Sequence, residues 1–297
     1  MRVLNFGSLN IDYVYSVDHF VQKGETLASN ALNIYTGGKG LNQSVALGRA
    51  GVKTYHAGAI GEDGQFLLDF LKKSGVDTTY VSKTDETRTG NAIIQTDKTG
   101  DNCILLFGGA NQAISKHQVD ATLSCFDEGD FIVLQNEINE MPYIIQKAHE
   151  KGMIIVLNPA PMNKKVSEMP LQLVDYLVVN EIEAAQLLER TFSEEEDVVI
   201  ADALVEKFPN TKIILTLGEK GSIYIEGKKR IIQEIYKTKV VDTTAAGDCF
   251  IGYFVAAIMQ KKSVEEAMNL AAKASAIAVS KAGAAPSIPM MEEVLNH

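Results

Sequence analysis

Cysteine is scarce in this sequence. The 297 residues include three cysteines, Cys103, Cys125 and Cys249, which lie far apart and form no C-x-x-C pair. An odd and widely spaced set argues against a disulfide framework and against a zinc site. A chain of this length buries enough apolar surface to fold without such cross-links. We therefore expect a protein of a reducing, cytoplasmic compartment.

Long apolar runs are also missing. Met1 and Arg2 lead directly into the short apolar run Val3–Phe6, and no hydrophobic core of a signal peptide follows. The longest uncharged stretch near the C-terminal end, Cys249–Gln260, is shorter than the roughly 18 residues that a membrane-spanning helix needs. We expect a soluble protein that has no membrane partner.

An excess of positive charge is absent as well. The chain carries 38 acidic and 28 basic residues, which gives a net charge of -10. A general electrostatic attraction to nucleic acids or anionic lipids is therefore not expected. Phosphate, if it is bound, has to be held locally by backbone N–H groups at glycine-rich turns and helix N-termini.

Short runs rich in Val, Ile and Leu alternate with segments of helical periodicity. The runs are Phe131–Leu134, Ile154–Leu157, Tyr176–Val179 and Ile213–Thr216, and the helical segments are Met141–Lys151, Glu181–Arg190 and Asp197–Lys207. Uniformly apolar runs of this length are typical of buried parallel strands, and their spacing suits βαβ crossovers. The sequence therefore predicts an α/β fold with a doubly wound, mostly parallel sheet flanked by helices.

The first hundred residues follow a different pattern. Strand-like segments interrupt the alternation at about Asn10–Val17, Thr26–Tyr35, Gly90–Thr96 and Asn102–Leu106. We interpret them as a small β-sheet lid, with strands inserted at about 10–38 and 88–108, because such sheets cover sites that must exclude water. No repeat or linker-like tract marks a second domain. Residues 1–297 are therefore expected to form a single α/β domain.

Two apolar helical patterns lie near the C-terminal end, over Gly247–Gln260 and Val264–Ser280, and both are expected to be buried. The loop Val241–Asp248 leads into the first of them and contributes free N–H groups at the helix start, from Ala245, Ala246 and Gly247. Such groups suit a transferring phosphoryl group. Asp248 is open to two interpretations: it caps the helix, or it is a general base that accepts a proton from a substrate hydroxyl.

A glycine-rich segment, Thr36–Gln43, precedes a helical pattern that runs to about Ala50. It lacks the G-x-x-x-x-G-K-[ST] spacing of a P-loop. By itself the segment is consistent with a turn at a helix start that carries a solvated lysine.

Polar residues also follow several predicted strands. Asn10 and Asp12 lie on one face after the first strand, where ligand crevices of open α/β sheets occur. Further along the chain come Glu137, the pair Asn180 and Glu183, and the glycine-bounded turn Thr216–Gly221. Taken alone, these residues are equally consistent with ordinary turns, helix-start charges and a hairpin.

Together the segments resemble the ribokinase family of carbohydrate kinases. Asp242–Asp248 is similar to the family signature D-T-x-A-A-G-D, and Gly37–Gln43 is similar to its sugar-binding motif G-G-K-G-x-N-Q. The resemblance extends in family order from Gly7 to Ser287. It implies that Asp248 is the catalytic base and that three backbone amides form an anion hole, those of Ala245, Ala246 and Gly247.

The resemblance also implies binding roles. The sugar would be bound by Asn10, Asp12, Gly38, Lys39, Asn42, Glu137 and Asp248. ATP would be bound by Asn180, Thr216, Gly218, Gly221 and Gly247. Mg2+ would be held through water by Glu183. A monovalent cation, K+, would be surrounded by Asp242, Thr244, Ala278, Lys281, Gly283 and Ser287.

Two positions depart from the family pattern. Cys249 follows the predicted base where threonine is common, and Ala272 lies where the family often has a polar contact to adenine. Neither departure removes a charge from the chemistry. At a helix start the Cys249 thiol would be reactive if it were exposed and inert if it were buried.

The resemblance predicts an ATP-dependent kinase that transfers the γ-phosphoryl group of Mg-ATP to a primary hydroxyl of a furanose, with D-ribose as the first candidate. The alternatives are a kinase for deoxyribose, a ketose or a nucleoside, and a catalytically silent sugar-binding protein. Asp12, Lys39 and Asn42 favour a small polyol, since a nucleoside site should present apolar or aromatic residues to the base. Exposed apolar segments such as Ala92–Ile94 suggest a homodimer that forms through the lid.

Overall fold

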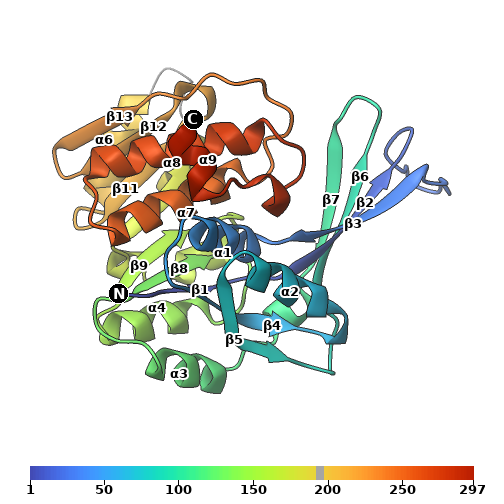
Figure 1. The fold of residues 1–297 in the computed structure, drawn as a ribbon, viewed down its shortest axis with the longest axis horizontal. Coiled ribbons are helices and arrows are strands. Elements are labelled where there is room, and N and C mark those ends of the chain that lie inside the picture. Colours follow the sequence, from blue (N-terminus) through green and yellow to red (C-terminus); the bar gives the residue numbers. More distant parts are fainter. Residues whose placement is uncertain (192–196) are drawn as a thin grey trace.

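A nine-stranded sheet is the scaffold of the molecule (Figure 1). The computed structural model describes residues 1–191 and 197–297, and the strand count refers to these ranges. In spatial order the strands are β13 (Lys229–Gln233), β12 (Ser222–Glu226), β11 (Lys212–Thr216), β10 (Tyr176–Asn180), β9 (Ile154–Asn158), β8 (Phe131–Gln135), β1 (Val3–Phe6), β4 (Thr54–Ile60) and β5 (Val76–Lys83).

The sheet is mostly parallel. From β5 across to β11 each pair of neighbours is parallel, whereas β12 is antiparallel to both β11 and β13. Successive side chains reach opposite faces, so that Val3 joins the core on one side and Leu4 the core on the other. Burial on both faces explains why the strands consist of continuous apolar runs. The predicted strand runs correspond to β8, β9, β10 and β11.

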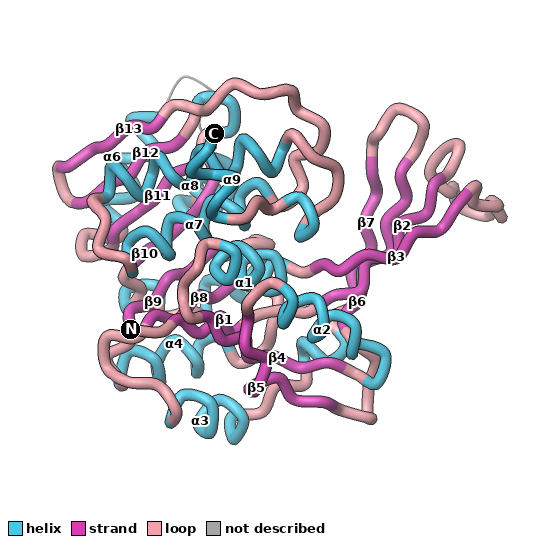
Figure 2. Tube along the Cα trace, viewed as in Figure 1, coloured by secondary structure: helices cyan, strands magenta, loops and turns pink. Residues whose placement is uncertain are grey.

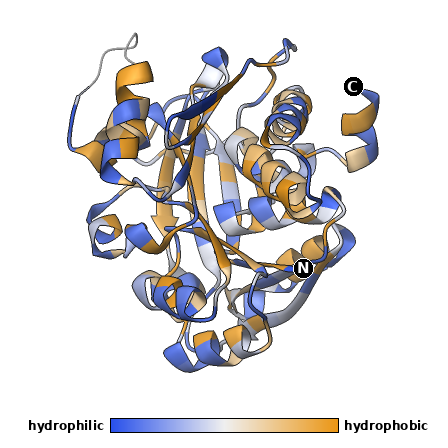
Figure 3. Ribbon diagram, turned by 90° about the vertical axis from the view of Figure 1, so that its left-hand side faces the viewer, coloured by the Kyte–Doolittle hydropathy of each residue, from blue (hydrophilic) through white to orange (hydrophobic). Residues whose placement is uncertain are grey.

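Helices cover both faces of the sheet. One face carries α1 (Lys39–Arg49), α2 (Gln65–Lys73), α7 (Ala246–Met259), α8 (Val264–Val279) and α9 (Met291–Asn296). The other carries α3 (Lys116–Ser124), α4 (Met141–Glu150), α5 (Glu181–Leu188) and α6 (Asp197–Lys207). Figure 3 shows the apolar strands between these helix layers. The predicted doubly wound α/β fold is confirmed.

The strand order changes direction between β1 and β8. From β1 the chain continues to β4 and β5 on one side, and then returns to β8 on the other side of β1. The strands β9, β10 and β11 follow outward from β8. Open α/β sheets bind ligands at the carboxyl ends of the strands beside such a point. This edge of the sheet is therefore where a site is expected.

A second, four-stranded sheet extends away from the main body (Figure 2). We call it the lid sheet, and it consists, in spatial order, of β3 (Ala31–Gly37), β2 (Asn10–Ser16), β6 (Gly90–Thr96) and β7 (Asn102–Phe107). The two central strands are parallel and the outer pairs are antiparallel. Both β2 and β3 join the main body directly, because β2 follows the end of β1 and β3 leads into α1.

One predicted strand boundary was wrong. The sequence pattern favoured a strand that begins at Thr26, but β3 begins at Ala31. Its partner β2 ends at Ser16, which pairs with Ala31, so residues before Ala31 have no strand beside them in the described lid sheet. Propensity alone did not show where the partner strand ends.

The helices α7 and α8 match the two predicted apolar helices, and most of α7 is buried. Glycine allows α7 to approach α1 closely, because a Cβ atom at Gly252 would lie 2.3 Å from the Cβ of Ala46. Among the helices in the described ranges, none is long and apolar enough to cross a membrane. The thiol of Cys249 is also buried in α7, and burial raises its pKa, so the inert alternative holds.

Candidate active site

The glycine-rich segment holds the start of α1 against the end of β1. Gly38 has a φ of 95°, which favours glycine. A Cβ atom at Gly40 would lie 2.3 Å from the backbone nitrogen of Ser8. The glycines therefore let two backbone segments meet, and this contact brings Lys39 and Asn42 to the switch point between β1 and β8.

Asp248 lies in the first turn of α7 and is 7% exposed. Its carboxylate accepts two hydrogen bonds from neighbouring residues of α1. Asn42 Nδ2 donates to Oδ2 at 2.9 Å, and Gln43 Nε2 donates to Oδ1 at 2.9 Å. The predicted base is thus bound to the glycine-rich segment, more than 200 residues away in the sequence.

The turn before α7 leaves room for a ligand. Ala245 has a φ of 62°, an uncommon value for a residue with a side chain, and it precedes the first helical residue. A Cβ atom at Gly247 would have no neighbour within 4 Å among the described residues. The N–H groups of a first helical turn have no partner within the helix, although that of Ala246 donates to the carbonyl of Thr243 just before the helix, at 3.2 Å. They and the helix dipole favour an anion at this point.

A cavity of about 230 Å³ opens onto this turn. Its lining includes eight of the predicted site residues, namely Lys39, Asn180, Glu183, Thr216, Ala245, Ala246, Gly247 and Asp248. Apart from Ala245, which precedes α7, they come from α1, β10, α5, β11 and α7. The other predicted residues lie outside this lining: Asn10, Asp12, Gly38, Asn42, Glu137, Gly218, Gly221 and the predicted potassium residues.

Lys39 supplies the positive charge of the cavity. The carboxylate of Asp248 is the main cause that raises the pKa of Lys39, burial opposes this shift, and Glu137 and Glu183 add to it. The ammonium group therefore stays protonated at neutral pH. It is surrounded by the carboxyl groups of Asp248, Glu137 and Glu183.

Glu137 fixes the glycine-rich segment. Its Oε2 accepts hydrogen bonds from the hydroxyl of Ser8 and, at 2.8 Å, from the backbone N–H of Lys39. Burial raises the pKa of Glu137 in spite of these two bonds. Glu137 therefore connects the end of β8 with the end of β1 and with the start of α1.

Glu183 and Asn180 form a capping box at the start of α5. Asn180 Oδ1 accepts from the N–H of Glu183 at 2.8 Å, and Glu183 Oε2 accepts from the N–H of Asn180 at 3.1 Å. Burial raises the pKa of Glu183 in spite of this bond. Both side chains also line the cavity, so capping does not remove them from the site.

Asp12 and Asn10 lie on the face of β2 that continues toward Glu137. Burial raises the pKa of Asp12 to about 7, and the nearby Glu137 adds to the shift. Gly37 makes room for this carboxylate, since a Cβ atom there would lie 2.0 Å from Oδ2 of Asp12. Asn10 is 7% exposed, and its Oδ1 accepts from Nδ2 of Asn111 at 2.7 Å.

The Asp242 carboxylate joins two loops of the predicted potassium site. It accepts from the N–H (2.9 Å) and hydroxyl (2.6 Å) of Thr244 and from the N–H of Gly283 (3.0 Å). Partial burial acts to raise the pKa of Asp242, but these hydrogen bonds outweigh it and hold the pKa below its ordinary value. The Lys281 side chain is directed to Glu293 on α9, and the Ser287 hydroxyl donates to the carbonyl of Ala284.

The turn after β11 continues the edge of the sheet beyond Thr216. Gly218 and Gly221 have φ values of 53° and 96°. A Cβ atom at Gly221 would lie 2.1 Å from the carbonyl oxygen of Gln233, so the turn also packs on the end of β13. These glycines shape the loop and lie next to the cavity, not in its lining.

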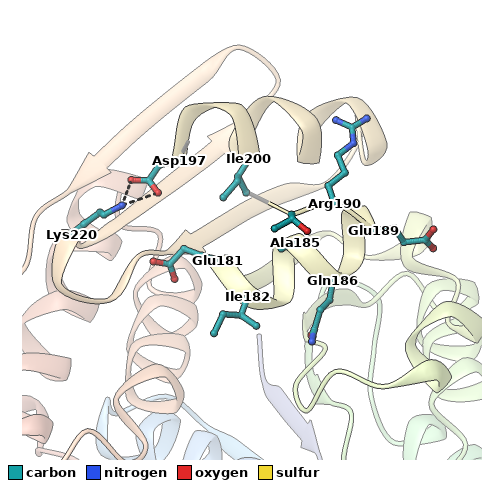
Figure 4. A pocket seen from close by; sticks show the side chains of 10 residues that line it. Glu181, Ile182, Ala185, Gln186, Glu189, Arg190, Asp197, Ile200 and Lys220 are labelled. Atoms are coloured by element: carbon teal, nitrogen blue, oxygen red, sulfur yellow. Dashed lines mark hydrogen bonds and ion pairs between the residues drawn. The ribbon is translucent and has the colours of Figure 1, made fainter. Parts of the chain in front are cut away.

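A larger hollow of about 660 Å³ lies along α5 and α6 (Figure 4). An ion pair of 3.0 Å between Lys220 and Asp197 lies at one end of it. The proposed chemistry does not use this hollow, because Asp248 and Lys39 are not among its lining residues.

Sequence reasoning missed two polar residues of the site. Gln43 was part of the recognised motif, but no role was assigned to it. Asn111, which is 2% exposed, holds the start of β2 through Leu9 and Asn10. The glycine pair Gly108–Gly109 at the end of a lid strand was the signal that could have drawn attention to Asn111.

Comparison with known proteins agrees with this geometry. Residues 2–291 match the pfkB family of carbohydrate kinases. The chain belongs to this family. A ribokinase of Haemophilus influenzae is 37% identical over 98% of this chain and 96% of its own length.

Solved structures of the family are also similar. A ribokinase of Arabidopsis thaliana complexed with ribose and ATP has a TM-score of 0.89 and 29% identity, over 99% of this chain and 97% of its own. A ribokinase of Cryptococcus neoformans in complex with ADP has a TM-score of 0.87 and 33% identity, over 99% of both chains. The predicted family and the fold with its lid sheet are therefore confirmed.

The raised pKa of Asp12 predicts a pH-dependent stability. Its pKa in the folded protein is about 7, above the ordinary 3.8, so the folded state holds the proton more tightly than the unfolded chain does. The stabilising contribution is present below pH 3.8 and is lost as the pH rises to about 7. Asp12→Asn should therefore gain stability relative to the wild type as the pH rises, by about 1–3 kcal/mol in total.

Urea unfolding of both proteins between pH 5 and pH 8 measures this difference. The advantage of the variant should grow up to about pH 7 and then level off. A difference that does not change with pH would contradict the assignment.

Proposed function

We propose that this protein is an ATP-dependent sugar kinase that transfers the γ-phosphoryl group of Mg-ATP to a primary hydroxyl of a furanose, with D-ribose converted to ribose 5-phosphate. One observation carries the proposal: the buried carboxylate of Asp248 shares a cavity with Lys39 and with the N-terminal turn of α7. The similar proteins named above are ribokinases, and one of their structures contains ribose and ATP.

Asp248 acts as the general base. It takes the proton of the sugar hydroxyl as the hydroxyl oxygen attacks the γ-phosphorus, and the bond between that phosphorus and the bridging oxygen breaks as ADP leaves. The backbone amides of Ala245, Ala246 and Gly247, together with Lys39, stabilise the charge on the transferring group. The lid sheet covers the sugar, so that water does not compete as the acceptor.

The polar residues at the end of β2 and in the glycine-rich segment bind the sugar. Asp12 accepts hydrogen bonds from two neighbouring hydroxyls, which selects for a vicinal diol because a missing hydroxyl leaves a buried acceptor without a partner. The remaining contacts come from Asn10, Gly38, Lys39, Asn42 and Glu137. Glu137 is tied to Ser8, so it also keeps the segment in place.

ATP binds along the edge of the sheet next to Asp248. Asn180 and Thr216 line the cavity, and the turn with Gly218 and Gly221, which follows Thr216 in the chain, would extend the nucleotide site. Mg2+ neutralises phosphate charge when it is bound. The lining fits this ion, because Glu183 offers a carboxylate oxygen and Mg2+ takes its remaining ligands from waters and phosphate oxygens.

The loop around Asp242 fits a monovalent cation. Its carboxylate accepts N–H hydrogen bonds from Thr244 and Gly283, so it joins two loops whose backbone carbonyl oxygens would coordinate K+. Ala278, Lys281 and Ser287 lie in and beside the loop that contains Gly283. The cation would hold the loop before α7 in the conformation in which its N–H groups point at the phosphoryl group.

Replacement of the base should abolish most turnover. We expect Asp248→Asn to lower kcat by about 10² to 10⁴-fold, with sugar binding largely intact, because the amide accepts no proton. ADP release should be measured with ribose, deoxyribose, ketoses, hexoses and nucleosides. Asp69→Asn, an exposed carboxylate of α2, is the matched control and should retain the wild-type rate.

Near-normal turnover by Asp248→Asn would exclude its role as the base. A wild-type protein that binds sugars and releases no ADP with any of them would instead establish the silent sugar-binding alternative. Faster turnover of another sugar than of ribose would correct the substrate.

Removal of potassium tests the Asp242 loop. If the cation contributes about 1.4 kcal/mol to the orientation of the loop, its replacement by choline should lower kcat about tenfold. Potassium should also raise the midpoint of thermal unfolding of the wild type, but not that of Asp242→Ala. An equal rise in both proteins would contradict the proposed site.

We also infer a single cytoplasmic kinase domain that forms a homodimer through the lid sheet. The strands β1 and β13, the first and the last along the described chain, share one sheet, which supports one folding unit. On the face of the lid sheet opposite Asp12, Ile34, Tyr13, Ile93 and Leu105 form a row across the four strands. Ile34, Ile93 and Leu105 are 54%, 40% and 67% exposed.

An uncharged apolar row meets an identical row without burying charge, so a second copy of the chain is a suitable partner. Ile93→Lys should therefore convert a dimer into a 32.3 kDa monomer, as measured by light scattering after gel filtration. Ile104→Lys is the matched control, because Ile104 is 53% exposed on the other face of the same sheet. A wild-type monomer, or a dimer that survives Ile93→Lys, would refute this interface.

A further inference from the structure

We propose that Gln43 is a positioning residue that orients the carboxylate of Asp248 through a buried chain of side-chain amides. The chain runs from Asn5 on β1 through Gln135 on β8 to Gln43 on α1. This inference rests on the proposed role of Asp248 as the base, and it adds residues that lie outside the lining of the cavity.

The orientation of the Gln43 amide is fixed from both ends. Its Nε2 donates to Oδ1 of Asp248 at 2.9 Å, and its Oε1 accepts from Nε2 of Gln135 at 2.7 Å. Gln135 can give this bond only through its NH2 group, so the carbonyl of Gln43 must face Gln135. The NH2 group of Gln43 is consequently directed at the carboxylate.

The chain continues into the sheet. Gln135 Nε2 also donates to Oδ1 of Asn5 at 3.1 Å, and Asn5 Nδ2 donates to the carbonyl of Gly40 at 2.9 Å. Strand alternation puts Asn5 on the same face as Val3, and it puts Gln135 on the same face as Val133, toward α1. The adjacent parallel strands β1 and β8 thus position the amide of Gln43, which in turn bonds to Asp248.

Burial of these amides costs free energy, because each polar group loses its hydrogen bonds to water. Asn5, Gln43 and Gln135 are all 0% exposed. Among the described residues, Oε1 of Gln135 has no hydrogen-bond partner, and a Cβ atom at Gly7 would lie 2.3 Å from it. An unpaired buried acceptor costs about 1–3 kcal/mol, and apolar side chains would avoid this cost. A role in positioning Asp248 would explain why amides, and not apolar side chains, are found at these buried positions.

Gln43 differs from its neighbour Asn42 in what it can offer a ligand. Both amides donate to Asp248, one to each oxygen. In the described part of the chain, Oδ1 of Asn42 has no partner, so Asn42 retains an acceptor for a substrate hydroxyl. Gln43 uses both of its ends inside the protein. Substitution of Gln43 should therefore change the orientation of Asp248 and leave the affinity for ligands unchanged.

Two donors on opposite oxygens set the plane of the carboxylate. Each oxygen then has a second lone-pair direction available, and one of these can face the sugar hydroxyl. Without Gln43 the carboxylate could turn about its terminal torsion, which is a broad and weakly restricted rotation. A misdirected base lowers the rate of proton transfer, because catalysis depends on alignment at short range.

Kinetics of Gln43→Met and Gln135→Met test the proposal. Methionine keeps roughly the same length and removes the hydrogen-bonding groups. We expect Gln43→Met to lower kcat by about 10 to 100-fold, with KM for sugar and ATP within about twofold of the wild type. Gln135→Met should lower kcat less, and the double variant should be no slower than Gln43→Met, since both act through one chain.

Ser44→Ala is the matched control. Ser44 follows Gln43 on α1 and is also 0% exposed, but its hydroxyl forms a hydrogen bond with Nδ1 of His56 at 2.7 Å, and the side chains that bond to Asp248 in the described ranges are those of Asn42 and Gln43. Burial lowers the pKa of His56 to about 4, so this side chain stays neutral under assay conditions. Ser44→Ala should lose stability and keep kcat within about twofold of the wild type.

Three results would overturn the proposal: a kcat of Gln43→Met equal to that of Ser44→Ala, a KM that rises as much as kcat falls, or a double variant whose losses multiply. If Gln43→Met does not fold, Gln135→Met alone decides, because an unchanged kcat there disproves the chain. An inactive wild type would refute the proposed function and this inference together, whereas an active wild type with unaffected variants refutes the inference only.

Discussion

The buried carboxylate of Asp248 is the constraint on which the rest of the site depends. A charge at this depth is tolerated only if neighbouring groups satisfy it. The first turn of α7, the ammonium group of Lys39 and two amides of α1 do so. The helices α1 and α7 must therefore stay in contact, and the absence of a side chain at Gly252 lets them pack closely against Ala46.

The site as a whole carries more negative than positive charge. Lys39 faces Asp248, Glu137 and Glu183, and burial raises the pKa of both glutamates and of Asp12. Groups whose pKa is shifted by burial and by like charges are typical of functional sites. A ligand that brings cations and hydroxyl donors would relieve this excess, as the proposed sugar and Mg2+-bound nucleotide would.

The topology of the sheet brings these groups together. The reversal of strand order between β1 and β8 puts the ends of both strands beside the start of α1. Glu137, which follows β8, accepts hydrogen bonds there from Ser8 and Lys39. The lid sheet grows from the same point, because β2 continues from β1 and β3 leads into α1. The proposed sugar-binding residues and the proposed base are thus connected through the start of α1.

The sequence by itself determined the strand and helix pattern, the family, and the residue types of the site, because apolar periodicity and short glycine-rich motifs are local properties. It did not determine where β3 begins, since that depends on where its partner β2 ends. Only the tertiary structure decided which side chains meet. Asn111 reaches Asn10, and Gln43 reaches Asp248, across more than 100 and 200 residues of sequence respectively, and no spacing along the chain encodes such contacts.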